Sequence, residues 1–478
     1  MRTLLLALLI GACAIPRTAF AAVDQAAAPS RGKTVEDWGT EHAGAIKAAI
    51  DPTDPMKTAA QTRAAAAGAL GPLTDGEVSD LILAASAYYL NIGNGAEGLA
   101  LGRGALAWDR AMKLGPSYEF DALVRTGSAL YLLTDYAAAA RDMQESVARA
   151  RAITPFDPNA VANATANYAV VLDANGRYRD SEAALQSALK LRLSATPVRP
   201  EGLATVYASL AGVQKRIGRF DLAEENYRKA LDVLERASLT AGRQYARALH
   251  NYAVLVSDEG RSEEAVRMYR RALELTTPEK RMEPGRLPDH SALASALVGL
   301  GRLDEAEAAI TNAIAIADKL PKPNIDVAPA YTNRARIREA RGDLAGAEAD
   351  QRRALAVDRQ VLGGDDNLEV PIDLAALAGE LRRNGKLAEA DAVSAEAVKL
   401  LASVPARNAH RAVVLDVRAA TLAANGKKRE ALASSRAASE ALAERFELDQ
   451  ARDPGPVPPE QRPIMGRRVS LAWDAAHP

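Results

Sequence analysis

One short run of glycines has the spacing of a cofactor loop. Gly93-Asn94-Gly95-Ala96-Glu97-Gly98 fits the GxGxxG pattern of dinucleotide-binding loops. That chemistry needs a strand before the glycines and a helix N-terminus facing the pyrophosphate. Here the glycines fall where a turn between two helices is expected. We therefore interpret the run as an inter-helix turn and expect no cofactor.

Other catalytic or metal-binding arrangements are missing from the sequence. The five histidines have no HxxxH or HExxH spacing, and no GxSxG or GxxxxGK motif occurs. Metal sites need ligands that share a face or adjacent elements. Acidic pairs such as Glu224-Glu225 and Glu263-Glu264 are expected on solvated helix faces. The sequence therefore predicts no metal site and no enzyme activity. The histidines are His42, His250, His290, His410 and His477.

A set of asparagines and arginines forms a more credible binding site than any of the catalytic or metal-binding motifs. Asn167, Asn251 and Asn333 each stand nine residues before a glycine of one regular series. An asparagine amide can both donate to and accept from an extended peptide backbone. The alternative is ordinary polarity of an exposed helix, and Ser209, Ala292, Ala376 and Val417 interrupt the series. The candidate peptide- or protein-binding residues are Asn163, Asn167, Arg216, Arg247, Asn251, Asn333 and Arg336.

These residues are positioned by a repeat of 41 to 43 residues. Alanine stands seven before and twelve after each turn glycine, a spacing that places small residues where two helices meet. Each glycine suits the left-handed backbone that ends a helix. Two degenerate units, around Gly93 and Thr134, precede the clear ones. The regular turn glycines are Gly176, Gly218, Gly260, Gly301, Gly342, Gly385 and Gly426.

This pattern resembles the tetratricopeptide repeat, in which a small residue, a turn glycine, an aromatic residue (Tyr178, Phe220) and later alanines recur. The long unit resembles the kinesin light chain type. The resemblance implies an all-α fold, a right-handed solenoid of stacked antiparallel helix pairs. It also implies a concave groove that binds peptides or proteins, and asparagines nine before the glycine that contact a peptide backbone.

The first residues read as an export signal. Arg2 precedes an apolar stretch, Leu4 to Ile10, and Ala19-Phe20-Ala21 forms a small-x-small cleavage site. We expect export to the periplasm. The alternative is a lipid-anchored envelope protein, because Ile10 to Cys13 fits a loose lipoprotein box in which Cys13 is lipidated.

The composition limits the kinds of partner and site that can be expected. Cys13 is the only cysteine, which excludes disulfides and thiolate sites from the repeats. Without residues 1–21, which contain two basic and no acidic residues, the formal charge changes from −1 to about −3. Such balance favours neither nucleic acid nor an anionic membrane surface. No later segment reaches the roughly 20 apolar residues of a transmembrane helix.

The expected organisation has four parts: a signal peptide (1–21), a leader with capping helices (22–77), an array of about nine repeats (78–445) and a proline-rich tail (446–478). We expect an exported scaffold, monomeric with a dimer as alternative, that binds a protein or peptide and serves assembly or regulation in the bacterial cell envelope. The alternative is a regulatory or small-ligand-binding module serving a separate enzyme.

Overall fold

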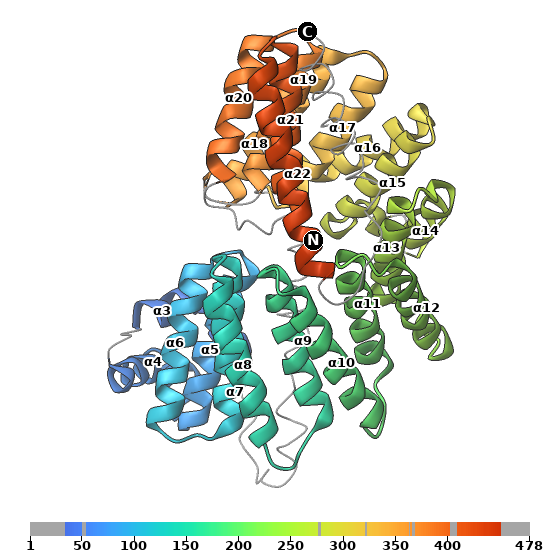
Figure 1. The fold of residues 1–478 in the computed structure, drawn as a ribbon. Coiled ribbons are helices and arrows are strands. Elements are labelled where there is room, and N and C mark those ends of the chain that lie inside the picture. Colours follow the sequence, from blue (N-terminus) through green and yellow to red (C-terminus); the bar gives the residue numbers. More distant parts are fainter. Residues whose placement is uncertain are drawn as a thin grey trace. The chain divides into compact units, whose positions relative to one another are not determined.

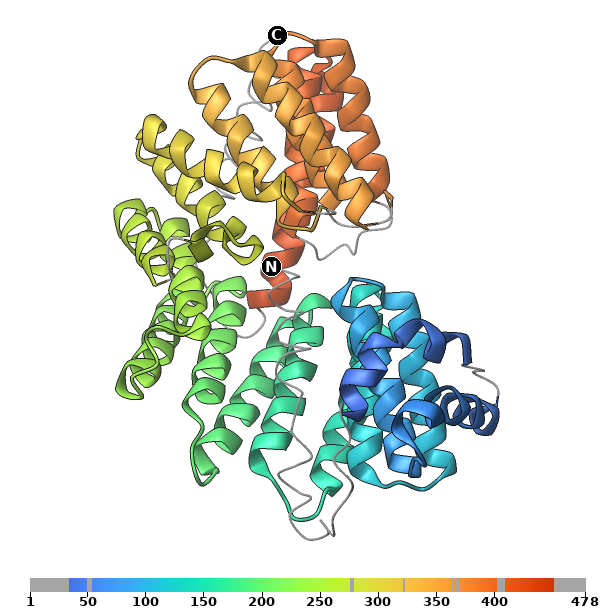
Figure 2. The same ribbon diagram turned by 180° about the vertical axis from the view of Figure 1, so that it is seen from behind.

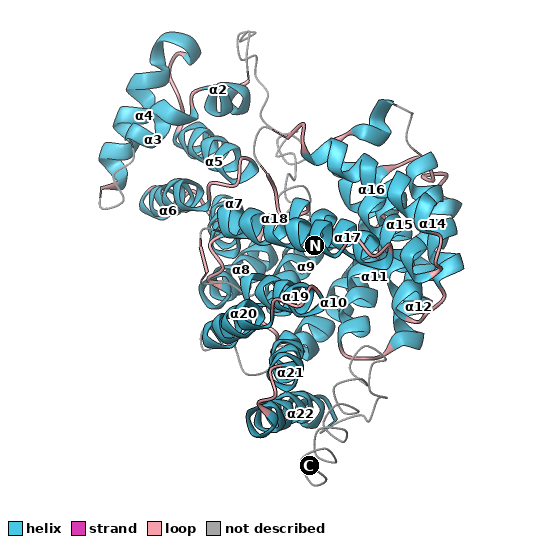
Figure 3. Cartoon of the chain, turned by 90° about the horizontal axis from the view of Figure 1, so that it is seen from above, coloured by secondary structure: helices cyan, strands magenta, loops and turns pink. Residues whose placement is uncertain are grey.

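The computed structural model describes residues 34–49, 54–275, 279–320, 323–362, 364–365, 369–401 and 409–450. The predicted signal peptide, Cys13 and the tail beyond residue 450 lie outside these residues. Within them the chain is all-α, with helices and loops but no strand (Figure 3). The chain divides into two compact units, residues 1–213 and 214–478, which are described separately.

The first unit is a stack of antiparallel helix pairs preceded by three further helices (Figure 1). Helix α5 pairs with α6, α7 with α8, and α9 with α10. Its helices are α2 (Val35–Glu41), α3 (Ala43–Ala49), α4 (Pro55–Leu70), α5 (Asp75–Asn91), α6 (Gly95–Ala111), α7 (Pro116–Leu132), α8 (Tyr136–Ala152), α9 (Pro158–Ala174) and α10 (Tyr178–Ser194); α11 (Pro200–Arg216) crosses into the second unit.

The second unit continues the same pattern, and its helix pairs are also visible from behind (Figure 2). Helix α13 pairs with α14, and the pairing continues through α21 with α22. Its helices are α12 (Phe220–Arg236), α13 (Arg243–Asp258), α14 (Ser262–Glu274), α15 (Leu287–Gly299), α16 (Leu303–Ala317), α17 (Val327–Ala340), α18 (Leu344–Leu362), α19 (Glu369–Arg383), α20 (Leu387–Leu400), α21 (Ala409–Ala424) and α22 (Lys428–Gln450), with 3-10 turns η2 (Glu279–Met282) and η3 (Pro284–Arg286) between α14 and α15.

The turn glycines separate the two helices of each repeat. Gly260 has φ of 80° and Gly176 has φ of 73°, in the left-handed region that a side chain resists. Thr134 adopts the same left-handed backbone, with φ of 64°, so the turn of repeat 2 forms without a glycine. The GxGxxG run occupies such a turn: Gly93 has φ of 78° between α5 and α6, and a Cβ at Gly98 would lie 2.5 Å from Leu90 Cδ2.

Alanines form the contact between the two helices of each repeat. Ala253 and Ala272, seven before and twelve after Gly260, have no exposed surface. The corresponding alanines of the other regular repeats are at most 1% exposed. Because interiors are close-packed, small residues at these positions let the two backbones approach closely. The few aromatic side chains, such as Tyr269 at 2% exposure, fill the remaining space.

The segment before the first pair, expected to hold capping helices, contains α2, α3 and α4. Helices α2 and α3 are separated at His42, and both pack on α5. The His42 ring stacks on Trp38 at 4.1 Å, and its Nδ1 contacts the Trp38 carbonyl at 3.0 Å. At the other end, α22 runs to Gln450, beyond Arg445 where the sequence pattern ends.

Candidate functional site

The candidate site is a stripe along the first helix of each repeat, defined by the positions 13, 9, 6 and 2 residues before the turn glycine. In the second unit the first helices α13, α15 and α17 of repeats 5, 6 and 7 pack successively on one another. Arg247, Asn251 and Val254 on α13 are half-buried, and Asp258 at its end is exposed. On α13 the stripe is therefore partly accessible.

In repeat 5 the predicted site residues have no partner in the part of the chain that the structure describes. Arg247 and Asn251 lie one turn apart on α13, and neither forms a hydrogen bond or ion pair with any other residue that the structure describes. Burial, together with the nearby Arg243 guanidinium, lowers the pKa of Arg247. A half-buried cation beside a second cation gains from an anion placed against it. This pair can therefore receive a carboxylate and a peptide amide.

The neighbouring His250 is already engaged. Its Nδ1 lies 2.7 Å from Asp289 Oδ1 on α15, and Arg286 donates to Asp289 Oδ2 at 2.9 Å. All three side chains are largely buried. The Asp289 carboxylate thus has two partners of its own, His250 and Arg286. Asp289 joins repeat 6 to repeat 5 through His250, and its carboxylate does not bond to Arg247.

In repeat 7 the same residue types are tied to the preceding repeat. Asn333 donates from Nδ2 to the Ser291 hydroxyl at 2.9 Å and to its carbonyl at 3.2 Å. Arg336 donates to Ser295 Oγ at 2.8 Å and more weakly to Asn333 Oδ1 at 3.4 Å. The Asn333 amide nitrogen therefore joins α17 to α15. Arg336 remains exposed and keeps donors that can reach a ligand.

In the first unit the predicted asparagines are also internally bonded. Asn163 Oδ1 accepts a hydrogen bond from Arg192, which also donates to Asn159 Oδ1 at 2.8 Å. Arg192 is 6% exposed on α10, and burial lowers its pKa. Asn167 is 2% exposed and has an interaction of its own. No sequence signal predicted that Arg192, on a second helix, would reach this stripe.

Arg216 completes the predicted set. It is the half-buried last residue of α11, in the second unit, and has an interaction of its own. The structure thus places the seven residues on first helices, as expected from their spacing. It leaves only Arg247 and Asn251 without a partner among the residues described.

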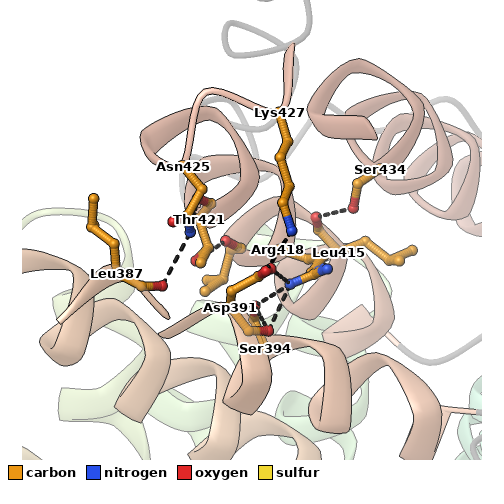
Figure 4. A network of polar contacts seen from close by, with 10 residues as sticks. Leu387, Asp391, Ser394, Leu415, Arg418, Thr421, Asn425, Lys427 and Ser434 are labelled. Atoms are coloured by element: carbon orange, nitrogen blue, oxygen red, sulfur yellow. Dashed lines mark hydrogen bonds and ion pairs between the residues drawn. The ribbon is translucent and has the colours of Figure 1, made fainter. Parts of the chain in front are cut away.

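Sequence reasoning missed a recurrent polar link between repeats. Asp391 on α20 accepts from Lys427 Nζ at 2.7 Å and from Arg418, and Arg418 also donates to Ser394 Oγ at 2.9 Å (Figure 4). Asn425 donates to the Leu387 carbonyl at 3.1 Å. The acid stands six after one turn glycine, and the lysine stands one after the next. The link fastens repeat 9 to repeat 8.

The same register recurs between repeats 7 and 8. Glu348 accepts from Lys386 Nζ and from Asn384 Nδ2, both at 2.8 Å, and from Arg352. Burial opposes ionisation of Glu348, but these donors outweigh it and lower its pKa to about 2. A carboxylate held by several charged donors is strongly stabilised in its ionised form.

Between repeats 4 and 5 the link corrects one expectation. Glu224 was predicted to belong to a solvated helix face. It is instead half-buried and accepts from Tyr252 Oη at 2.6 Å and Arg261 at 2.8 Å. The prediction was wrong because its partners come from the next repeat, 28 and 37 residues further along the chain.

Among the described residues no group of three or more His, Cys, Asp or Glu side chains could hold a metal ion. In the same ranges, no helix combines the length and the apolar character needed to cross a membrane.

Comparison with known proteins gives the class of the fold. Residues 202–277 and 327–368 each match the tetratricopeptide repeat family. Together with the stacked helix pairs, these matches define a helical-repeat protein. The chain is a tetratricopeptide repeat protein. No curated protein sequence matches it significantly.

Two solved structures of similar fold cover more than three quarters of the chain, and a third covers about half of it. RapI in its apo form covers 78% of this chain and 99% of its own, with 12% identity and a TM-score of 0.51. The apo quorum sensor NprR from B. thuringiensis covers 77% and 100%, with 12% identity and a TM-score of 0.50. BtubC (BKLC) from P. vanneervenii covers 47% and 93%, with 21% identity and a TM-score of 0.41. At these identities the likeness concerns the fold.

Proposed function

We propose that this protein is a non-catalytic scaffold that binds an extended, acidic segment of another protein through repeat 5. Arg247 holds a carboxylate of the partner, and Asn251 pairs with its backbone. The observation that carries the proposal is the half-buried Arg247–Asn251 pair, which has no partner within the described residues. The tetratricopeptide repeat fold, widely used for binding proteins and peptides, supports the same reading.

The charge of the partner follows from the surroundings of Arg247. Elsewhere in this unit, less exposed or comparable arginines have carboxylates: Arg286 binds Asp289, Arg334 binds Asp350 and Arg418 binds Asp391. Arg247 forms no ion pair with a carboxylate within the described ranges, and the nearby Arg243 is a second cation. Burying a cation without an anion is costly, so the site favours an acidic residue or a chain carboxylate from outside.

Peptide binding tests this proposal. On an array of ten-residue peptides, the full chain should retain acidic peptides and release the same peptides with Glu and Asp replaced by Gln and Asn. The Arg247→Met/Asn251→Ala variant should lose them, whereas Asn333→Ala should keep them. Equal retention of acidic and amidated peptides would refute the role of Arg247. Retention by the double variant would place binding elsewhere on the chain.

We also propose that the scaffold works outside the cytoplasm, as an exported and periplasmic protein that assembles or regulates envelope proteins. The support is the segment Arg2 to Ala21, with its apolar stretch and small-x-small site. Mass spectrometry of the mature N-terminus separates the two processing routes. A chain that begins at Ala22 agrees with soluble export, a lipidated Cys13 indicates an envelope anchor, and an uncleaved cytoplasmic chain contradicts both.

A further inference from the structure

The stripe of the first helices changes character in the last two repeats. In repeat 5 it carries Arg247, Asn251 and Asp258. In repeat 9 all four stripe positions, on α21, hold apolar residues, and in repeat 8 the first two positions, on α19, do so. Helices α19 and α21 pack on each other. We call these six residues the C-terminal apolar stripe: Ile372, Ala376, Val413, Val417, Ala420 and Ala424.

Part of the C-terminal apolar stripe is open to solvent. Val413 is 38% exposed, and Ala424 at the end of α21 is also exposed. Val417 and Ile372 are half-buried. Among the described residues of the second unit, only Leu222 and Val413 are large apolar side chains with that much exposure. The spacing of the four α21 positions places them on one face of the helix, and a connected apolar strip on a surface marks a place where another segment binds.

Arginines beside this stripe are already paired with carboxylates of the array. On α21, Arg418 pairs with Asp391 of α20 (Figure 4). Arg383, at the last stripe position of repeat 8, pairs with Glu380 at 2.6 Å and with Glu339 of α17 at 2.8 Å. The stripe thus differs from that of repeat 5, where the described residues supply no carboxylate to the cation. It therefore favours an apolar occupant.

The chain itself contains a segment of matching chemistry. Residues 451–478 follow α22 and lie outside the described residues. Their sequence includes Val469, Leu471 and Trp473, three large apolar residues at alternate positions. In an extended peptide, alternate side chains point to one side and are about 6.6 Å apart. Val413 and Val417 are one helical turn apart, about 6 Å along α21, so the two spacings agree.

The tail beyond residue 450 starts close enough to reach the stripe. Helix α22 pairs with α21 and runs back antiparallel to it after the turn at Gly426. Because α22 is the longer helix, it ends at Gln450 about 16 Å beyond the level of Val413. The segment 451–468 can span about 60 Å when it is extended. It is therefore long enough to bring the apolar residues that follow it back to the stripe.

We propose that the C-terminal apolar stripe binds the chain's own segment Val469 to Trp473. The alternate apolar side chains of this segment cover Val413, Val417 and Ile372 and remove them from water. The tail then occupies repeats 8 and 9, while the stripe of repeat 5 stays free for an acidic partner. The two sites are independent, and the tail binds its stripe whether or not repeat 5 binds a peptide.

The outer face of α22 is a poorer place for the tail. Ala433, Arg436 and Glu440 share one face of this helix, and all three are exposed. Two of them are charged, so this face is already suited to water, as the end of a repeat array must be. It offers less apolar surface to cover than the C-terminal apolar stripe.

Photocrosslinking of the full chain tests the proposal. A photoreactive residue replaces Val413, and in a second chain it replaces Arg436 on the outer face of α22. We expect an adduct from position 413 to the tryptic peptide Val469–Pro478, with a yield independent of protein concentration, and none from position 436. Three results would overturn the proposal: no such adduct from position 413, a tail adduct from position 436 alone, or a yield that rises with protein concentration and assigns the stripe to a second copy.

Variants of the tail leave the helical array unaltered and test the apolar contact. Leu471→Ser/Trp473→Ser should lower the adduct yield from position 413 at least about tenfold, because two large side chains lose their burial. Ser470→Ala/Ala472→Ser changes the alternate positions of the same segment and should leave the yield unchanged. Equal yields from both double variants would contradict docking through Leu471 and Trp473.

Discussion

Repeats 5 and 7 present the same kinds of side chain on the same stripe, but only repeat 5 leaves them available. Asn251 and Asn333 both stand nine residues before their turn glycine. Asn333 is bonded to Ser291 of the preceding repeat, whereas Asn251 has no such bond among the described residues. A polar stripe is therefore not in itself a binding site. What distinguishes repeat 5 is that the preceding helix does not supply a partner.

The largest effect is expected from substitutions that disturb the helix packing common to both repeats. Ala253→Leu and Ala335→Leu place a larger side chain between two helices where the alanine is at most 1% exposed. Overpacking should lower the free energy of unfolding by about 1–3 kcal/mol in both variants, measured by chemical denaturation. Ala356→Leu, on an exposed position of α18, should change it by less than about 0.5 kcal/mol. Equal effects at all three positions would argue against the alanine contact.

Next in size is the loss of binding in repeat 5. Arg247→Met should weaken binding of an acidic peptide by about 10-fold to 100-fold, because a hydrogen bond to a charged group contributes about 1.5–3 kcal/mol. Fluorescence anisotropy with a peptide retained on the array gives the dissociation constant. Stability should be unchanged or higher, since an unpaired cation is removed. A destabilised Arg247→Met chain with full binding would reverse the roles assigned to the two repeats.

A smaller effect is expected from Asn333→Ala, and it tests the difference between the asparagines of repeats 5 and 7. Asn333→Ala removes the bonds to Ser291 and should lower the free energy of unfolding by about 1 kcal/mol. Peptide affinity should change less than threefold. Asn251→Ala is the matched control and should affect affinity without affecting stability. If both variants lose stability equally, the distinction between the two asparagines fails.

The smallest effect concerns Arg336. It is exposed, and its bond to Ser295 Oγ is open to water, so Arg336→Met should change stability by less than about 0.5 kcal/mol. Denaturation beside the Asn333→Ala chain provides the measurement. A loss larger than that of Asn333→Ala would make Arg336, and not Asn333, the main contact between these repeats.

The sequence predicted the fold well because its signals are local. Gly260 needs a left-handed backbone, and Ala253 and Ala272 need close helix approach, whatever lies further along the chain. The site was predicted less completely. Asn163 and Asn333 were correctly placed on first helices, but their partners, Arg192 and Ser291, depend on packing 29 and 42 residues away.

The most direct test of the proposed site is photocrosslinking from its centre. A photoreactive residue replaces Val254, half-buried on the stripe of α13, and in a second chain replaces Arg267, exposed on α14. With a bound acidic peptide, we predict an adduct from position 254 that disappears when Arg247 is changed to Met, and none from position 267. An adduct only from position 267, or one from position 254 that persists without Arg247, would contradict binding at repeat 5.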